Sequence, residues 1–184
     1  MDKRTFRKSI LAEIEALPAD YIEASNAGIR DNFSALPEFQ KAHTIFAYIS
    51  VGREPDTVGI IQVALDAGKT VALPVSLDGG IMQPHCIHSL SELVPGKFGI
   101  PAPPENAPII DSGDIDLIIV PAVTFDRRGF RLGRGGGYYD RFLQSSGAFS
   151  VGLGRNLLIR PVPLEPHDMS VDCLVTESGV YREK

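Results

Sequence analysis

The segment DIDLIIVP at residues 114–121 is the feature that most narrows the choice of folds for this chain. It is almost entirely apolar and lacks the alternation of polar and apolar residues that marks a strand with one face in water. Such a run is typical of a parallel strand buried on both faces. It therefore predicts a sheet that is covered by helices on either side.

Further apolar runs along the chain alternate with segments of helical periodicity. The other predicted strands cover residues 44–51, 70–74, 81–88, 148–154 and 172–177. The predicted helices cover residues 3–17, 20–33, 57–67 and 138–145. This alternation predicts an α/β fold, a three-layer α/β/α sandwich around a mostly parallel sheet. The length of 184 residues favours a single domain over residues 1–184.

Local signals place several of these boundaries. Asp20 with Glu23 resembles a capping box that opens the second helix. Asp56 or Thr57 is suited to cap the third helix. Residues 95–108 are rich in proline, and we expect them to form an ordered surface loop.

The loop after the apolar strand, RLGRGGGYYD at residues 131–140, combines arginines, glycines and an acid. In open α/β sheets, ligands bind beyond the carboxyl ends of the strands. Glycines let backbone N–H groups approach an anion, and the N-terminus of a following helix adds a positive dipole. Because Arg131 and Arg134 can add fork-like hydrogen bonds to phosphate oxygens, the loop predicts a polyphosphate site.

This loop follows neither of two common phosphate-binding patterns. GxxxxGK followed by Ser or Thr is absent from the sequence, and the GxGxxG that begins at Gly133 and Gly135 ends in Tyr138. Glycines alone would be compatible with a mobile turn. The arginines and the strand–loop–helix context favour a binding site instead.

Three acids accompany the loop as candidate site residues. Asp140 directly follows the loop and is a natural oxygen ligand for Mg²⁺, or else an acid that favours the helix dipole. Asp168 is a second candidate oxygen ligand, and we expect His167 beside it to be structural because Mg²⁺ prefers oxygen. Glu54 follows the strand at residues 44–51 and should lie at the same sheet edge, either hydrogen-bonding an N–H-rich ring or solvated.

Composition limits the classes of function. The chain carries 18 Lys and Arg against 23 Asp and Glu, a net charge of −5, which argues against a general electrostatic grip on nucleic acid or an anionic membrane. No apolar run approaches the roughly 18 residues of a membrane span, and the N-terminus lacks the apolar region of a signal peptide. We expect a soluble, cytoplasmic protein in which Cys86 and Cys173 are reduced.

The motif RLGRGGGYYDRFL, with PAVTFDRRGF before it, resembles the 5-formyltetrahydrofolate cyclo-ligase family, also called 5,10-methenyltetrahydrofolate synthetases. The segments KRTFRK, REPDT, GKTVALP and PLEPHDMSVDCLVTESGV are similar to further family segments, in the same order along essentially the whole chain. The resemblance implies an ATP- and Mg²⁺-dependent cyclisation of 5-formyltetrahydrofolate to 5,10-methenyltetrahydrofolate, with release of ADP and phosphate. The implied route is phosphorylation of the formyl oxygen followed by ring closure through N10.

The same resemblance implies a set of site residues. The implied ATP contacts are Lys3, Arg4, Arg7, Arg131, Leu132, Gly133, Arg134, Gly135, Gly136, Gly137, Tyr138 and Tyr139. The implied folate contacts are Ile49, Glu54, Arg134, Gly135, Gly136, Gly137 and Tyr138. Asp140 and Asp168 are the implied Mg²⁺ ligands, and Arg134 and Tyr138 are the expected catalytic residues.

Two positions depart from the family pattern, and two other functions stay open. Gly136 stands where some members have lysine, which leaves the phosphate charge to Arg131 and Arg134, and Pro55 stands where a β-branched residue is usual. The alternatives are a divergent paralogue with the same ATP loop and another substrate, and an RNA-binding module suggested by the RGG sequence. We expect ATP and the folate as small-molecule partners, no nucleic acid, no membrane, and a monomer.

Overall fold

One seven-stranded sheet forms the centre of the protein. The computed structural model describes residues 2–182, and the strand order is β11-β10-β9-β6-β1-β2-β3. The strands are β1 (Thr44–Phe46), β2 (Thr70–Ser76), β3 (Met82–Ile87), β6 (Leu117–Val120), β9 (Phe149–Leu153), β10 (Cys173–Thr176) and β11 (Gly179–Arg182). The five inner strands pair in parallel, and the edge strands β3 and β11 are antiparallel. The predicted mostly parallel sheet is therefore confirmed.

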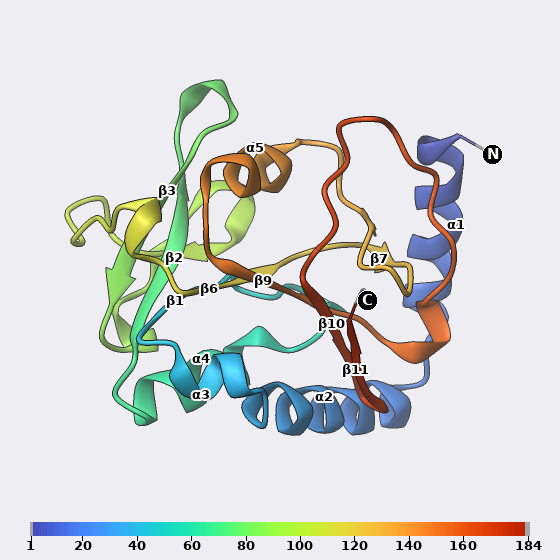
Figure 1. Cartoon of the computed structure of the whole chain (residues 1–184), viewed down its shortest axis with the longest axis horizontal. Coiled ribbons are helices and arrows are strands. Elements are labelled where there is room, and N and C mark those ends of the chain that lie inside the picture. Colours follow the sequence, from blue (N-terminus) through green and yellow to red (C-terminus); the bar gives the residue numbers. More distant parts are fainter. Residues whose placement is uncertain (1, 183–184) are drawn as a thin grey trace.

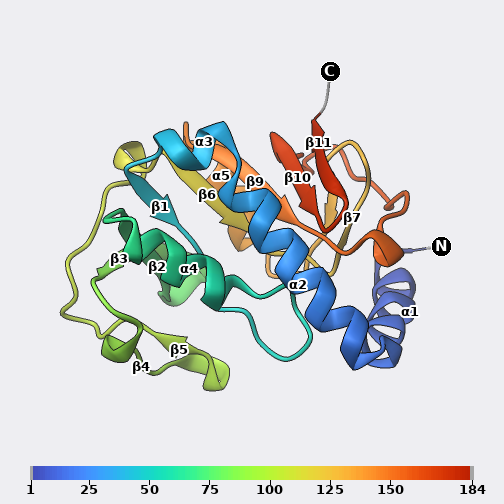
Figure 2. The same ribbon diagram turned by 90° about the horizontal axis from the view of Figure 1, so that it is seen from below.

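Helices cover both faces of this sheet (Figures 1 and 2). One face carries α2 (Ala19–Ser34), α3 (Pro37–Lys41) and α4 (Thr57–Asp66), and the other carries α5 (Tyr138–Ser145). The N-terminal helix α1 (Lys3–Ala16) stands beyond the sheet and contacts the short turn that follows β9. The predicted three-layer arrangement is confirmed. Within residues 2–182, no helix has the length and apolar character needed to cross a membrane.

The central strand β6 explains why the sequence shows a continuous apolar run. Its four residues are fully buried, and they alternate between two separate cores. Leu117 and Ile119 pack into the core that α2, α3 and α4 cover. Ile118 and Val120 pack into the second core, to which Phe142 of α5 belongs. A strand between two apolar layers needs apolar residues at every position, which is the pattern of the sequence.

The capping box expected at the start of the second helix is wrong. The helix α2 begins at Ala19, and Pro18 precedes it without any side-chain capping bond. Asp20 lies in the first helical turn and accepts a hydrogen bond from the adjacent amide of Tyr21. Proline fixes the extended entry of the chain, so the helix starts one position earlier than the acid suggests. For α4, in contrast, Asp56 caps the helix as expected.

Two small hairpins lie outside the main sheet. Within the proline-rich segment, β4 (Val94–Pro95) pairs with β5 (Pro101–Ala102) around the turn Lys97–Gly99. Ahead of the glycine loop, β7 (Thr124–Phe125) pairs with β8 (Arg131–Leu132). Sequence patterns indicated loops at both places, because pairs of two residues are too short to show any periodicity.

The glycine in β9 provides a test of how tightly the second core is packed. A Cβ atom at Gly152 would lie 2.5 Å from the ring of the buried Phe125. We expect Gly152→Ala to destabilise the fold by about 1–3 kcal/mol, the usual cost of overpacking. Urea denaturation measures this change.

The matched control for this substitution is Gly147→Ala. No atom lies within 4 Å of a Cβ at Gly147, which precedes β9. A surface change of this kind should shift the free energy of unfolding by no more than about 0.5 kcal/mol. Equal stability of the two variants would contradict the close contact of Gly152 with Phe125.

Candidate active site

A single cleft of about 1400 Å³ opens at the carboxyl ends of β1, β2 and β6. Every site residue that the resemblance implies lines it, from helix α1, from the loop after β1, from the glycine loop and from the segment before β10: Lys3, Arg4, Arg7, Ile49, Glu54, Arg131, Leu132, Gly133, Arg134, Gly135, Gly136, Gly137, Tyr138, Tyr139, Asp140 and Asp168. The structure thus brings all of these residues together where α/β sheets bind their ligands.

The glycine loop joins β8 to α5 at the floor of this cleft. Gly135 and Gly137 have φ angles of 101° and 65°, which only glycine adopts without strain. Arg7 donates from Nε to the carbonyl of Gly133 at 2.8 Å, so α1 is fastened to the loop. Because no side chain caps α5, the N–H groups of its first turn are available to an anion in the cleft.

The two arginines of the loop occupy different surroundings. The side chain of Arg131 is only 4% exposed, and it donates to Asp140 Oδ1 at 2.6 Å and to the carbonyl of Met169 at 2.8 Å. Burial lowers the pKa of Arg131, while the charge of Asp140 opposes that shift. The side chain of Arg134 is 64% exposed at the cleft. Arg134 is therefore the loop arginine that is more accessible from the cleft, and Arg131 fixes the base of α5.

Arg134 also bridges the glycine loop and the loop after β1. Its Nη2 lies 2.6 Å from Glu54 Oε1. The other oxygen, Oε2, accepts a hydrogen bond from the amide of Val51 at 3.0 Å. The expectation that Glu54 faces the same sheet edge as the glycine loop is therefore confirmed. The carboxylate is held on a short turn and presented to the cleft.

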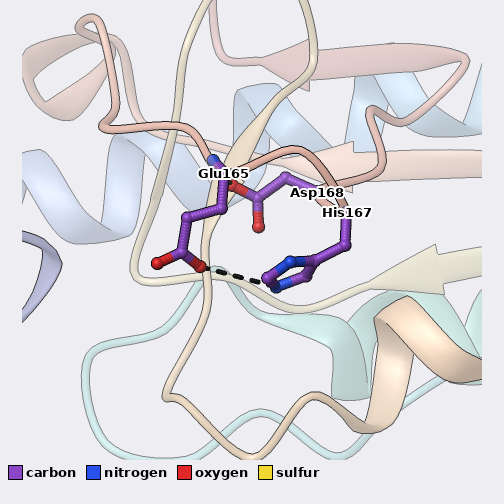
Figure 3. Close-up of side chains that lie close together, drawn as sticks. All are labelled: Glu165, His167 and Asp168. Carbon is purple, nitrogen blue, oxygen red and sulfur yellow. Dashed lines mark hydrogen bonds and ion pairs between the residues drawn. The ribbon is translucent and has the colours of Figure 1, made fainter.

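The segment before β10 contributes a third group of charges (Figure 3). Lys3 Nζ lies 2.7 Å from Asp168 Oδ2 and 2.9 Å from Glu165 Oε2. His167 points toward the same Glu165 oxygen at 3.4 Å. Burial on its own would raise the pKa of Asp168, but the hydrogen bonds from Lys3 and from the amide of Glu165 lower it overall. Asp168 is thus an ionised carboxylate at the cleft wall.

These carboxylates suit the hard cation that the resemblance implies. Asp140 and Asp168 both line the cleft, and each is paired with a basic side chain. Carboxylate oxygens are the ligands that Mg²⁺ prefers. Among residues 2–182, one group of three side chains has metal-binding atoms within 4.8 Å of one another. It consists of Glu165, His167 and Asp168, and it does not include Asp140. Asp140 and Asp168 nevertheless both act on the charge of Arg131.

Several residues at the cleft could not be identified from the sequence. Tyr48 lies buried beside Glu54, and burial together with that carboxylate raises its pKa, so the phenol stays neutral. Lys97 and Phe98 line the cleft from the turn of the β4–β5 hairpin, and the Phe98 side chain is almost entirely exposed at a φ of 60°. An exposed aromatic residue held in a left-handed conformation suggests a functional position, but the sequence shows neither property.

The fold and the site together define an α/β protein with a large cleft, lined by charged side chains, at the carboxyl ends of its strands. A sequence model of the 5-formyltetrahydrofolate cyclo-ligase family matches residues 1–177. The chain belongs to this family.

Named relatives cover nearly the whole chain. A 5-formyltetrahydrofolate cyclo-ligase of Mycolicibacterium smegmatis is 31% identical over 182 residues, which is 95% of this chain and 93% of that protein. The enzyme of the same name from Escherichia coli K12 is 34% identical over 152 residues, covering 79% of this chain and 84% of its own length. The NMR structure of Aquifex aeolicus 5,10-methenyltetrahydrofolate synthetase superposes with a TM-score of 0.87 at 32% identity, covering 99% of this chain and 93% of that one.

The ion pair between Arg131 and Asp140 makes a prediction about stability. Asp140→Ala leaves a buried guanidinium without its carboxylate, and removing one partner of a buried pair costs about 3–5 kcal/mol. Because Asp140 is partly exposed, we expect a loss of about 3 kcal/mol in urea denaturation. Asp140→Asn keeps an acceptor for Arg131 and should cost less. Equal losses from both variants would contradict this prediction, because they would show that the acceptor kept in Asp140→Asn contributes nothing and that the charge of Asp140 accounts for the whole loss.

Proposed function

We propose that this protein closes the imidazoline ring of 5,10-methenyltetrahydrofolate from 5-formyltetrahydrofolate at the expense of ATP, as its family does. The observation that carries the proposal is the convergence of all implied ATP and folate contacts on one cleft. Its volume of about 1400 Å³ exceeds the roughly 300–1,000 Å³ of a typical single-ligand pocket, so two substrates can lie side by side.

The charges divide the cleft into a phosphate side and a folate side. On the phosphate side, the glycine loop, Lys3, Arg7 and Arg134 surround the place of the triphosphate. On the folate side, Glu54 offers a carboxylate to the N–H groups of the pterin ring, while Ile49 and the hairpin with Phe98 supply apolar surface. Arg134 lies between the two sides, next to Glu54, where the γ-phosphate meets the formyl oxygen.

The chemistry requires two bonds to form in sequence. The formyl oxygen takes the γ-phosphoryl group, and ADP leaves. N10 then attacks the formyl carbon and loses its proton, and the C–O bond breaks so that inorganic phosphate departs with the oxygen. Phosphoryl transfer depends mainly on positioning and on neutralising charge, which is the role we assign to Arg134 and to the N–H groups of the loop. Tyr138, as the first residue of α5, orients the two substrates.

Magnesium and a monomeric state belong to the same proposal. Asp140 and Asp168 would hold Mg²⁺, which when bound would neutralise charge on the phosphates of ATP. Asp140 is paired with Arg131 and Asp168 with Lys3, so these two basic side chains keep the carboxylates in place at the cleft. The presence of every implied residue in one chain supports action as a monomer.

The reaction itself is the first test. Purified protein with 5-formyltetrahydrofolate, ATP and Mg²⁺ should produce the ultraviolet absorbance of the methenyl product. Omission of any one of the three should abolish it, because the formamide oxygen is a poor leaving group without phosphorylation. ATP turnover without methenyl product would favour a paralogue with another substrate. Product formation without ATP would refute the mechanism.

Glu54→Gln tests the folate side. A hydrogen bond to a charged group contributes roughly 1.5–3 kcal/mol, so the folate KM should rise roughly 10- to 150-fold, while the ATP KM changes little. Glu38→Gln is the matched control, because Glu38 also pairs with an arginine, Arg182, but on the far edge of the sheet. An unchanged folate KM in Glu54→Gln would leave Glu54 as a loop acid.

A further inference from the structure

Arg155 is a buried cation just behind the candidate active site. It follows β9, and 2% of its surface is exposed. Its guanidinium donates to Ser25 Oγ at 2.9 Å and to Asn26 Oδ1 at 2.7 Å, both on α2. It also donates to two backbone carbonyls of the loop after β1, those of Arg53 at 2.8 Å and Glu54 at 3.3 Å.

All of these acceptors are neutral. In the part of the chain that the structure describes, no carboxylate oxygen lies within 4.0 Å of the Arg155 guanidinium. Burial accordingly lowers the pKa of Arg155. A buried charge costs free energy, and well-packed apolar residues often stabilise a fold as well or better. What arginine provides at this position is a fixed geometry, because its rigid guanidinium fork binds two backbone carbonyls at once.

The loop that Arg155 contacts carries Glu54. From behind, Arg155 holds two successive carbonyls of this turn, and Asn26, which also binds Arg155, accepts a hydrogen bond from the amide of Asp56 at 3.3 Å. From the front, Val51 and Arg134 hold the two oxygens of the Glu54 carboxylate. The position of the Glu54 carboxylate therefore depends on how firmly this turn of the backbone is held.

We propose that Arg155 is a positioning residue for folate binding, which fixes the turn at residues 51–54 so that the Glu54 carboxylate faces the cleft. Arg155 does not itself line the large cleft; it borders a separate cavity of about 30 Å³ behind Glu54. Its effect on the substrate must therefore pass through Glu54. The inference deepens the proposed function and rests on the role of Glu54 given there.

Hydrogen exchange tests the positioning without any assumption about substrates. Arg155→Met keeps a long apolar side chain but removes the donors to the carbonyls of Arg53 and Glu54. We expect the amides of residues 51–54 and of Asp56 to exchange at least several-fold faster in this variant. Arg182→Met is the matched control: it removes an arginine that pairs with Glu38 away from the cleft, and it should leave residues 51–56 unchanged. Unaltered exchange in Arg155→Met would overturn the proposal.

Steady-state kinetics, measured well below the melting temperature of each variant, test the link to folate. In Arg155→Met the folate KM should rise about 10-fold, equivalent to ~1.4 kcal/mol, with an ATP KM within about twofold of the parent. Since Arg155 acts through Glu54, the double variant Glu54→Gln with Arg155→Met should bind folate no more than about twofold worse than Glu54→Gln alone. Fully additive losses in the double variant would refute action through Glu54.

Arg155→Lys keeps the inference testable if the methionine variant does not fold. Its ammonium keeps the charge but lacks the planar fork that binds both carbonyls in one arrangement, so the folate KM and the exchange rate of the amides of residues 51–54 should still rise above those of the parent. If the folate KM and the exchange rates of Arg155→Lys both equal those of the parent, the guanidinium is not needed to fix the turn, and the proposal fails. If Glu54→Gln leaves the folate KM unchanged, the proposed role of Glu54 fails by itself, and the exchange data then decide whether Arg155 fixes the turn.

Discussion

The burial of β6 on both faces is the constraint on which the rest of the structure depends. Leu117 and Ile119 on one side and Ile118 and Val120 on the other each need an apolar layer. Parallel neighbours and helices on both faces meet that need. Only the ends of the strands are then left open to solvent and ligands. The segments after β1, β2 and β6 leave the sheet at these carboxyl ends, so the fold itself sets the position of the cleft (Figure 1).

Charge in the cleft is organised as ion pairs, two of which join distant parts of the chain. Lys3 meets Asp168, Arg131 meets Asp140 and Arg134 meets Glu54. A net-acidic chain can thereby gather cations around the place of a triphosphate without leaving them unbalanced before the substrate arrives. The two loop arginines differ in burial, and this difference indicates different roles for Arg131 and Arg134. The buried guanidinium of Arg131 supports the loop, whereas the exposed Arg134 is the arginine that we propose contacts the substrates.

Support for the site reaches beyond the residues that line it. Arg7 fastens α1 to the glycine loop through the carbonyl of Gly133, and Arg141 binds the carbonyl of Gly136 and, at 2.9 Å, that of Gly80 in the β2–β3 turn. Arg155 performs a comparable task behind Glu54. Glycine-rich and proline-containing loops have little packing of their own, so buried or bridging arginines that bind their carbonyls are an effective way to fix them.

The sequence by itself determined the layers, the parallel sheet and the residues of the glycine loop, because continuous apolar runs, helical periodicity and glycine-rich composition are local signals. Its family motifs also named Glu54, Asp140 and Asp168, all of which line the cleft. Only the tertiary structure decided which charges are already paired, that Arg131 is buried, that Phe98 faces the cleft and that Arg155 lies behind Glu54. Burial and pairing depend on contacts between residues more than a hundred positions apart, such as Arg155 with Arg53, and a one-dimensional pattern carries no information about such distances.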